Sequence, residues 1–382
     1  MTNLSFEIDG ICNILRIIVG GIIMNFAVTA FFGAGSSAVI DLLEEYSCNF
    51  SGFSEARLYE HTAFYTPGGL FDLEDKLIFG NDIHRSDEAL LTFKQEMKRL
   101  NDNNFGWFGS YKDLFSEKFE KIVESFLDEL PTYEIQSTYY GRYKSVKFSF
   151  IKLVIQLGAR LMQHRKIYKW GRLYVIRPKE KRMCVCFPSK EEFYSAGKKF
   201  VSSYMKLFED NIHENVIFDR LILCHNLHRI ANYFDEKFRV IVVHRDIRDI
   251  YILNKYLWPK MHCSRMYPTD LNEFIDYWRH MNQNIIHTQD SRILNIWFED
   301  LIYNYGDTVR TIEVHCGLEE FEHTEMYKFF QPERSINNTQ VFIGHPEWEN
   351  EINILEHELS EHLYPFPFEH MADGSKMFDD SR

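Results

Sequence analysis

The residues best suited to chemistry in this 382-residue chain form a short run of small side chains, Gly33-Ala-Gly-Ser-Ser37. An apolar segment, residues 24–32, precedes the run and predicts a buried strand, and residues 38–46 follow with helical spacing. Small residues let backbone N–H groups approach a phosphate, and a helix N-terminus adds its positive dipole. The run therefore predicts an anion site. The alternative is an ordinary strand–helix turn, and no Lys follows Gly35 as an ATP-type loop requires.

A second junction carries two arginines. Residues 239–244 predict another buried strand, and Arg245 and Arg248 follow at its carboxyl end, where open α/β sheets bind ligands. Arginine suits this role because its planar guanidinium can bind phosphate through two hydrogen bonds. The alternative is a helix-capping arrangement, with Asp246 at the N-cap and Arg248 paired to Asp249.

A third junction, Ile296-Trp-Phe-Glu-Asp-Leu301, precedes a predicted helix at residues 308–316. Together and in this order, the three junctions resemble sulfotransferases that use 3′-phosphoadenosine 5′-phosphosulfate (PAPS). In that family a loop of the type Lys/Arg-Ser-Gly-Ser/Thr-Ser/Thr follows the first strand, a later strand ends in an Arg-Asp/Asn-Pro-Arg/Lys-Asp motif, and a Tyr/Phe-Glu-Asp-Leu stretch precedes a late helix. The matching residues here are Gly33–Ser37, Arg245–Asp249 and Phe298–Leu301.

The resemblance implies transfer of a sulfuryl group from PAPS to a hydroxyl or amine. The expected acceptor is a glycan, since the pattern is similar to bacterial enzymes that sulfate surface polysaccharides. It implies that Gly33, Ala34, Gly35, Ser36 and Ser37 bind the 5′-phosphate side of PAPS. Arg245 is the expected ligand of the 3′-phosphate, and the arrangement requires no metal.

The chain departs from the family pattern at three positions. Gly33 stands where the family has a Lys or Arg, Ile247 replaces the Pro of the second motif, and Leu253 stands where a Ser shares the 3′-phosphate. Two other functions therefore stay open. One is a non-catalytic protein of this fold that binds anionic glycans. The other is a P-loop kinase-like phosphotransferase, which would need Mg²⁺ and a loop Lys.

The resemblance offers two residues as the general base. A predicted strand at residues 216–224 ends beside His225, where soluble family members carry a catalytic His, and glycan-modifying members use a Glu after the first helix, the region of Glu60. Histidine is the usual base near neutral pH, and a Glu can serve when burial raises its pKa. A structural role is the alternative for each side chain.

Strands alternate with helices through the second half of the chain, which indicates βαβ units and a mainly parallel sheet. We therefore predict a three-layer α/β/α P-loop-like domain over residues 24–364. A basic insertion at about 132–206 is expected to hold a helix at 147–164 and a hairpin made by 173–176 and 183–187. Residues 1–23 are predicted to be an N-terminal extension, and 365–382 a flexible tail.

The charge of the chain is uneven. The formal net charge is −13, yet residues 142–206 contain 17 Lys and Arg against three acidic residues, a local charge of +14. The acidic remainder argues against nucleic-acid binding over the whole surface. The basic block predicts either an anion-binding surface, suited to an anionic glycan, or a solvated face.

Residues 11–32 hold a single charge, Arg16, and are long enough to span a membrane. If residues 24–32 form a strand, the remaining apolar stretch is too short, so we expect no membrane anchor. The seven cysteines include no CxxC pair, which favours a reducing compartment. The prediction is a cytoplasmic protein, with an N-terminally anchored one as the alternative.

Overall fold

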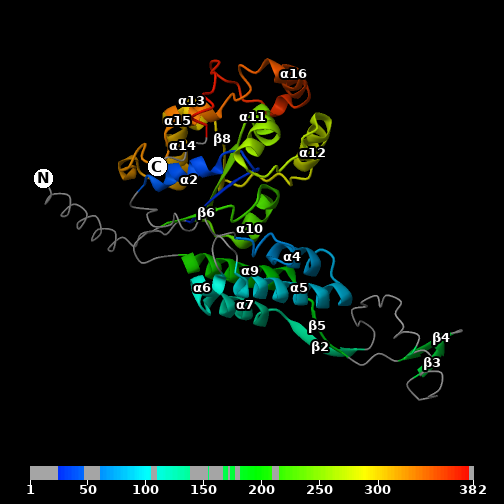
Figure 1. Ribbon diagram of the computed structural model, residues 1–382. Coiled ribbons are helices and arrows are strands. Elements are labelled where there is room, and N and C mark those ends of the chain that lie inside the picture. Colours follow the sequence, from blue (N-terminus) through cyan, green and yellow to red (C-terminus); the bar gives the residue numbers. More distant parts are fainter. Residues whose placement is uncertain are drawn as a thin grey trace, which may run out of the picture.

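The computed structural model describes residues 25–46, 61–104, 110–137, 154, 167–170, 173–176, 181–208 and 215–377. Its centre is a four-stranded sheet in the order β6-β1-β7-β8, in which all neighbouring strands are parallel (Figure 1). The strands are β1 (Asn25–Ala30), β6 (Val216–Asp219), β7 (Arg239–His244) and β8 (Ile293–Trp297). The first and third of these confirm the strands predicted at 24–32 and 239–244, and they are direct neighbours in the sheet.

Both faces of the sheet are covered, because successive residues of a strand point to opposite sides. Phe26 and Val28 pack with α2 (Ser36–Glu44), α13 (Asp300–Tyr303) and α14 (Tyr305–Cys316). Ala27 packs on the other side with η3 (Cys224–Arg229), α10 (Ile230–Tyr233) and a layer of further helices. The predicted three-layer α/β architecture with a parallel sheet is therefore confirmed.

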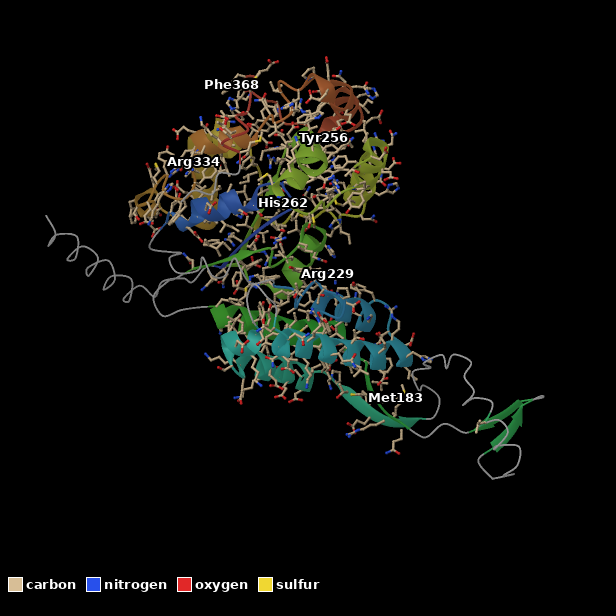
Figure 2. The ribbon with its side chains drawn as sticks, viewed as in Figure 1. Met183, Arg229, Tyr256, His262, Arg334 and Phe368 are labelled. Carbon is tan, nitrogen blue, oxygen red and sulfur yellow. The ribbon has the colours of Figure 1, made fainter. Side chains whose placement is uncertain are left out.

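A helical layer rich in aromatic side chains lies beside α10 (Figure 1). It consists of α4 (Leu70–Leu77), α5 (Ile83–Asp102), α6 (Tyr111–Phe115), α7 (Lys118–Asp128) and α9 (Lys190–Met205). Buried Arg229 joins this layer to η3, since it forms ion pairs with Glu74 and Asp75 of α4. Figure 2 places Arg229 beside this layer.

The remaining helices cover the carboxyl ends of the strands. They are α11 (Ile247–Ile252), the π-helical η4 (Leu253–Leu257), η5 (Trp258–Met261), α12 (Leu271–Gln283), α15 (Pro332–Ser335) and α16 (Glu349–Glu358). Short 3₁₀ turns are η2 (Lys206–Phe208), η6 (Glu320–Glu322), η7 (Ile336–Asn338), η8 (Pro346–Trp348) and η9 (Ser360–His362). Leu253, Phe274 and Leu355 share one buried apolar core that joins η4, α12 and α16.

The insertion corrects one prediction. The strands predicted as a hairpin exist, but they pair with other partners: β5 (Lys181–Cys186) pairs antiparallel with β2 (Thr132–Ser137), and β4 (Leu173–Ile176) with β3 (Ile167–Trp170). Figure 1 shows the ribbon of β2 and β5 leading away from the helical layer. The alternation of apolar residues indicated strands but could not say which strands pair. Apart from Val154, the helix predicted at 147–164 lies outside the described residues.

Part of the predicted tail makes hydrogen bonds to the domain. Gln340 donates a hydrogen bond to the carbonyl of Phe368 at 2.9 Å, and the backbone N–H of Asp373 donates one to Asn337 at 3.0 Å. This part of the tail therefore packs against the domain although it contains no regular element.

The N-terminal extension, residues 1–23, lies outside the described residues. Within the part of the chain that the structure describes, no helix is long and apolar enough to cross a membrane. Nor do the described His, Cys, Asp and Glu side chains form a group of three or more that could hold a metal ion.

Candidate functional site

The chain turns from β1 into α2 through residues 31–35. Gly33 and Gly35 have φ values of +83° and +92°, in the left-handed region that glycine adopts without steric cost. A Cβ atom at Gly33 would lie 2.6 Å from the Trp258 ring, and one at Gly35 would lie 2.6 Å from the Phe298 ring. This conformation therefore leaves no room for the Lys or Arg that the family has at position 33.

A cavity of about 590 Å³, which we call the loop cavity, opens against this turn. Gly33 and Gly35 line it from the turn and Ser36 and Ser37 from the start of α2, as do Arg245 after β7 and Phe298 after β8. Ala34 is buried and lines a second cavity instead. The three junctions selected from the sequence thus meet at one cavity, at the carboxyl ends of three adjacent strands.

A fourth strand end contributes a residue that the sequence analysis missed. Strand β6 ends at Asp219, five residues earlier than predicted, so Arg220 rather than His225 follows it and lines the loop cavity. Arg220 has φ +51°, which is uncommon for a residue other than glycine, and its backbone N–H donates to the carbonyl of Val28 at 2.8 Å. The only signal in the sequence was a charged pair at the end of an apolar run.

The C-terminal part of the chain supplies further cations. Lys328, Arg334 and Lys376 line the loop cavity, and Figure 2 places Arg334 near α2. The Lys328 ammonium lies 2.7 Å from Glu325. The Asp, Glu, Lys and Arg residues that line the cavity within the described chain are Arg220, Arg245, Lys328, Arg334, Lys376, Asp41 and Asp219. Cations therefore outnumber acids there, which favours an anionic ligand.

The buried side chain of Glu45 holds residues 323–330, the start of what we call the C-terminal segment (residues 323–376), against the end of α2. The side chain of Glu45 accepts hydrogen bonds from the backbone N–H groups of Phe329 and Phe330 at 2.9 and 2.8 Å, and it contacts His323 at 2.8 Å. Glu45 is fully buried. Because three partners satisfy it, Glu45 fixes the chain on either side of Lys328 next to the loop cavity.

The Arg245 side chain is buried in the wall of the loop cavity, where it bonds to the backbone. Its guanidinium donates to the carbonyl of Gly33 at 2.8 Å and to the carbonyl of Asn338, and it lies over the Phe298 ring at 4.9 Å. The side chain is only 5% exposed. Arg245 therefore ties the loop to the C-terminal segment, and only part of its hydrogen-bonding capacity can face a ligand.

Buried carboxyl groups surround Arg245. Burial raises the pKa of Asp249, an effect that Arg245 opposes and Asp246 reinforces. Burial also raises the pKa of Glu299, with the negative charges of Asp246 and Asp249 adding to the shift. Asp249 accepts hydrogen bonds from the backbone of residues 340 and 341. Asp249 therefore holds residues 340 and 341 against α11.

The helix-capping alternative for the second junction is correct for Asp246 but not for the pairing of Arg248. Asp246 caps α11 by accepting from the backbone N–H of Arg248 at 2.9 Å, and the Arg248 side chain pairs with Asp246 and Glu356 rather than with Asp249. Leu253 is fully buried in apolar surroundings. Neither Arg248 nor Leu253 therefore offers a free polar group to a ligand in the loop cavity.

The predicted base His225 lies in η3, away from the strand end. Its Nε2 lies 3.1 Å from the carbonyl of Met281, and since a carbonyl only accepts, Nε2 carries the hydrogen and Nδ1 is the acceptor. The His225 ring packs edge-on against Phe31 at 5.7 Å, and Phe31 lines the loop cavity. The catalytic role of His225 stays a prediction.

The other candidate base, Glu60, lies outside the described residues. The next residue, His61, is fully buried among Tyr204, Phe208 and Phe218. Burial, together with the positive charge of Arg220, lowers the pKa of His61 to about 3. His61 is therefore an uncharged core residue.

No family model matches the chain, and no curated protein does. Among solved structures, the fold is similar to a crystal structure of retinol dehydratase in complex with androsterone and the inactive cofactor PAP. The TM-score is 0.31 at 11% identity, over 91% of this chain and 82% of that chain. A similarity at this level does not assign a function.

Proposed function

We propose that this protein binds PAPS in the loop cavity and transfers its sulfuryl group to a hydroxyl or amine of an acceptor. The observation that carries the proposal is the convergence of the three junctions on one cationic cavity. Gly35, Arg245 and Phe298 are more than fifty residues apart in sequence, yet they line the same space. The order of the junctions along the chain resembles that of PAPS-dependent sulfotransferases.

The phosphosulfate group would lie against the start of α2. The first N–H groups of a helix have no partner within the helix, and the hydroxyls of Ser36 and Ser37 add donors. In this arrangement Arg220 replaces the cation that Gly33 cannot supply. Because Leu253 has no hydroxyl and Arg245 is tied to two carbonyls, Arg334 and Lys376 are the side chains expected to bind the 3′-phosphate.

The transfer step needs a base and stabilisation of the leaving group. The acceptor oxygen forms a bond to sulfur while the bond from sulfur to the bridging oxygen breaks, and that electron pair leaves with the nucleotide bisphosphate. Nδ1 of His225 takes the acceptor's proton. Charge that develops on the bridging oxygen is stabilised by the loop N–H groups and Arg220, which are already in place before the reaction.

A glycan remains the proposed acceptor. Ten of the 17 Lys and Arg residues in the basic segment 142–206, which would attract an anionic glycan, lie outside the described residues, so the role of this segment is a proposal from charge alone. The phosphotransferase alternative is less favoured, because the 33–37 loop has neither the Lys nor the space for one.

Binding of 3′,5′-adenosine bisphosphate, measured by calorimetry, tests the proposal. We expect the bisphosphate to bind at least tenfold more tightly than ATP or GTP. Arg220→Met should weaken its binding by about 10- to 100-fold, since a hydrogen bond to a charged group contributes roughly 1.5–3 kcal/mol. Arg310→Met is the matched control, because Arg310 is an exposed arginine of α14 outside the cavity. Tighter binding of ATP, or equal losses for the two variants, would overturn the proposal.

A further inference from the structure

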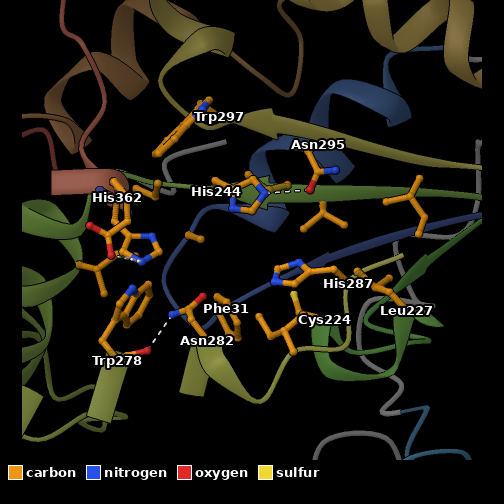
Figure 3. Close-up of a pocket in the computed structure, with 18 of the residues that line it drawn as sticks. Phe31, Cys224, Leu227, His244, Trp278, Asn282, His287, Asn295, Trp297 and His362 are labelled. Atoms are coloured by element: carbon orange, nitrogen blue, oxygen red, sulfur yellow. Dashed lines mark hydrogen bonds and ion pairs between the residues drawn. The ribbon is translucent and has the colours of Figure 1, made fainter. Parts of the chain in front are cut away.

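A second cavity lies beside the loop cavity and has a different character. It encloses about 440 Å³ over the carboxyl-terminal half of β7 and along β8, and we call it the β7–β8 cavity (Figure 3). Phe31 and Arg245 line both cavities and therefore form part of the wall between them. Its volume lies within the range of small-molecule sites, roughly 300–1,000 Å³.

The wall of the β7–β8 cavity is largely apolar and aromatic. Trp278 of α12 and Trp297 of β8 supply ring surfaces, and Val242 and Ile293 add aliphatic surface from the sheet. The Asp, Glu, Lys and Arg residues in the described lining are Arg245 and Glu361. One cation and one acid leave no excess of charge, and Arg245 already bonds to two carbonyls. The cavity is therefore suited to an uncharged ligand.

One buried donor in this cavity has no acceptor. Trp278 is 3% exposed, and its Nε1 has no hydrogen-bond partner among the described residues. An indole N–H buried without a partner costs free energy, so it usually has one. Figure 3 shows Trp278, His244 and His362 around the same space. The Trp278 N–H is itself closed off from the open space of the cavity, so a ligand oxygen would reach it only when a neighbouring side chain moves, whereas the indole ring surface faces a ligand directly.

Polar side chains at the end of β7 and on β8 add hydrogen-bond donors and acceptors to the β7–β8 cavity. Nε2 of His244 lies 2.9 Å from Oδ1 of Asn295, so His244 donates there, which leaves its Nδ1 as an acceptor and the Asn295 NH₂ as a donor. Burial and the nearby His244 lower the pKa of His362, although Glu361 opposes the shift. Donors and acceptors without net charge are the complement of hydroxyl groups.

We propose that the β7–β8 cavity binds an uncharged ring that carries hydroxyl groups and has one apolar face. The proposal rests on the proposed function in one respect: the ring would belong to the sulfuryl acceptor. Phe31 supports this link, because its ring contacts Trp278 at 5.6 Å and His225 at 5.7 Å. A hydroxyl held beside Phe31 would lie close to the proposed base and to the loop cavity.

Saturation-transfer NMR on the full chain, without nucleotide, tests the cavity directly. The probes are methyl β-glucoside, its 6-carboxylate methyl β-glucuronide, and phenol. We expect a neutral probe to bind at least tenfold more tightly than the carboxylate, and the comparison of glucoside with phenol tells a sugar ring from an aromatic one. Equal or tighter binding of the carboxylate, or binding of none of the three, would overturn the proposal.

Two variants locate the site. Trp278→Phe keeps an aromatic ring but removes the N–H, and Asn295→Leu removes the exposed polar group without disturbing the core; each should weaken probe binding at least fivefold. Tyr277→Phe is the control, because Tyr277 is an exposed neighbour on α12 outside the cavity. If neither variant differs from the control, the proposal fails. Adenosine bisphosphate binding is measured in parallel. If only ring binding is lost, the proposal that the loop cavity binds PAPS still stands. If only nucleotide binding is lost, the proposal that the β7–β8 cavity binds a ring still stands.

Discussion

The loop cavity and the β7–β8 cavity share Phe31 and Arg245 but differ in charge. Five of the seven Asp, Glu, Lys and Arg side chains in the described lining of the loop cavity are cations, whereas the β7–β8 cavity has one Arg, one Glu and several aromatic rings. The difference arises from the elements that reach each cavity. The end of β6 and the C-terminal segment bring cations to one, and α12 and β8 bring tryptophans to the other. One sheet edge can therefore present an anion site and a neutral site side by side.

The largest expected effect comes from a methyl group at the loop. Gly35→Ala forces a side chain into the left-handed region and onto Phe298. We expect a loss of about 2–5 kcal/mol in the free energy of unfolding, roughly 1–2 from the backbone and 1–3 from overpacking. Urea unfolding measures it. Gly306→Ala is the control, since nothing lies within 4 Å of a Cβ at that position. Equal stabilities of the two variants would show that the loop is not held as described.

An intermediate effect should appear as a pH dependence of stability that originates at Glu299, one of the buried carboxyl groups around Arg245, which with Phe31 lines both cavities. The folded protein raises the pKa of Glu299, so folding favours its protonated form. The resulting stabilisation is complete below the unfolded pKa of about 4.3 and is lost as the pH rises through the folded pKa. Glu299→Gln mimics the protonated side chain, and it should reduce the fall in stability by up to about 1.4 kcal/mol per pH unit within that window.

Unfolding in urea between pH 5 and 8 checks this prediction. Glu320→Gln, at an exposed position on η6, serves as the control and should leave the slope unchanged. A slope that Glu299→Gln does not reduce would mean that Glu299 stays ionised beneath Arg245 across this range.

The smallest expected effect is a difference between the two cavities in the salt dependence of ligand binding. Exposed charges are screened within about 10 Å at 0.1 M ionic strength. Raising KCl from 50 to 500 mM should therefore weaken adenosine bisphosphate binding by about tenfold, while binding of the neutral ring changes less than about twofold. Calorimetry and NMR titration give the two dissociation constants. Parallel losses for both ligands would contradict the contrast in charge.

The sequence by itself determined the local features. Apolar runs ending in small or charged residues located β1, β7 and β8, and the alternation of strands and helices implied that the carboxyl ends of these strands share one edge. It also located the turn at residues 33–37. Each of these features depends on residues that are close together in sequence. The composition and spacing of those residues are therefore enough to predict it.

Only the tertiary structure decided which partners meet. It placed Arg220 and the segment around Arg334 at the loop, directed Arg245 toward the carbonyl of Gly33, and paired β5 with β2 rather than with β4. It also filled the space above Gly33 with the Trp258 ring, which excludes a longer side chain there. Periodicity tells which face of an element is buried but not what covers it, because contacts between residues far apart in sequence depend on the packing of the whole chain.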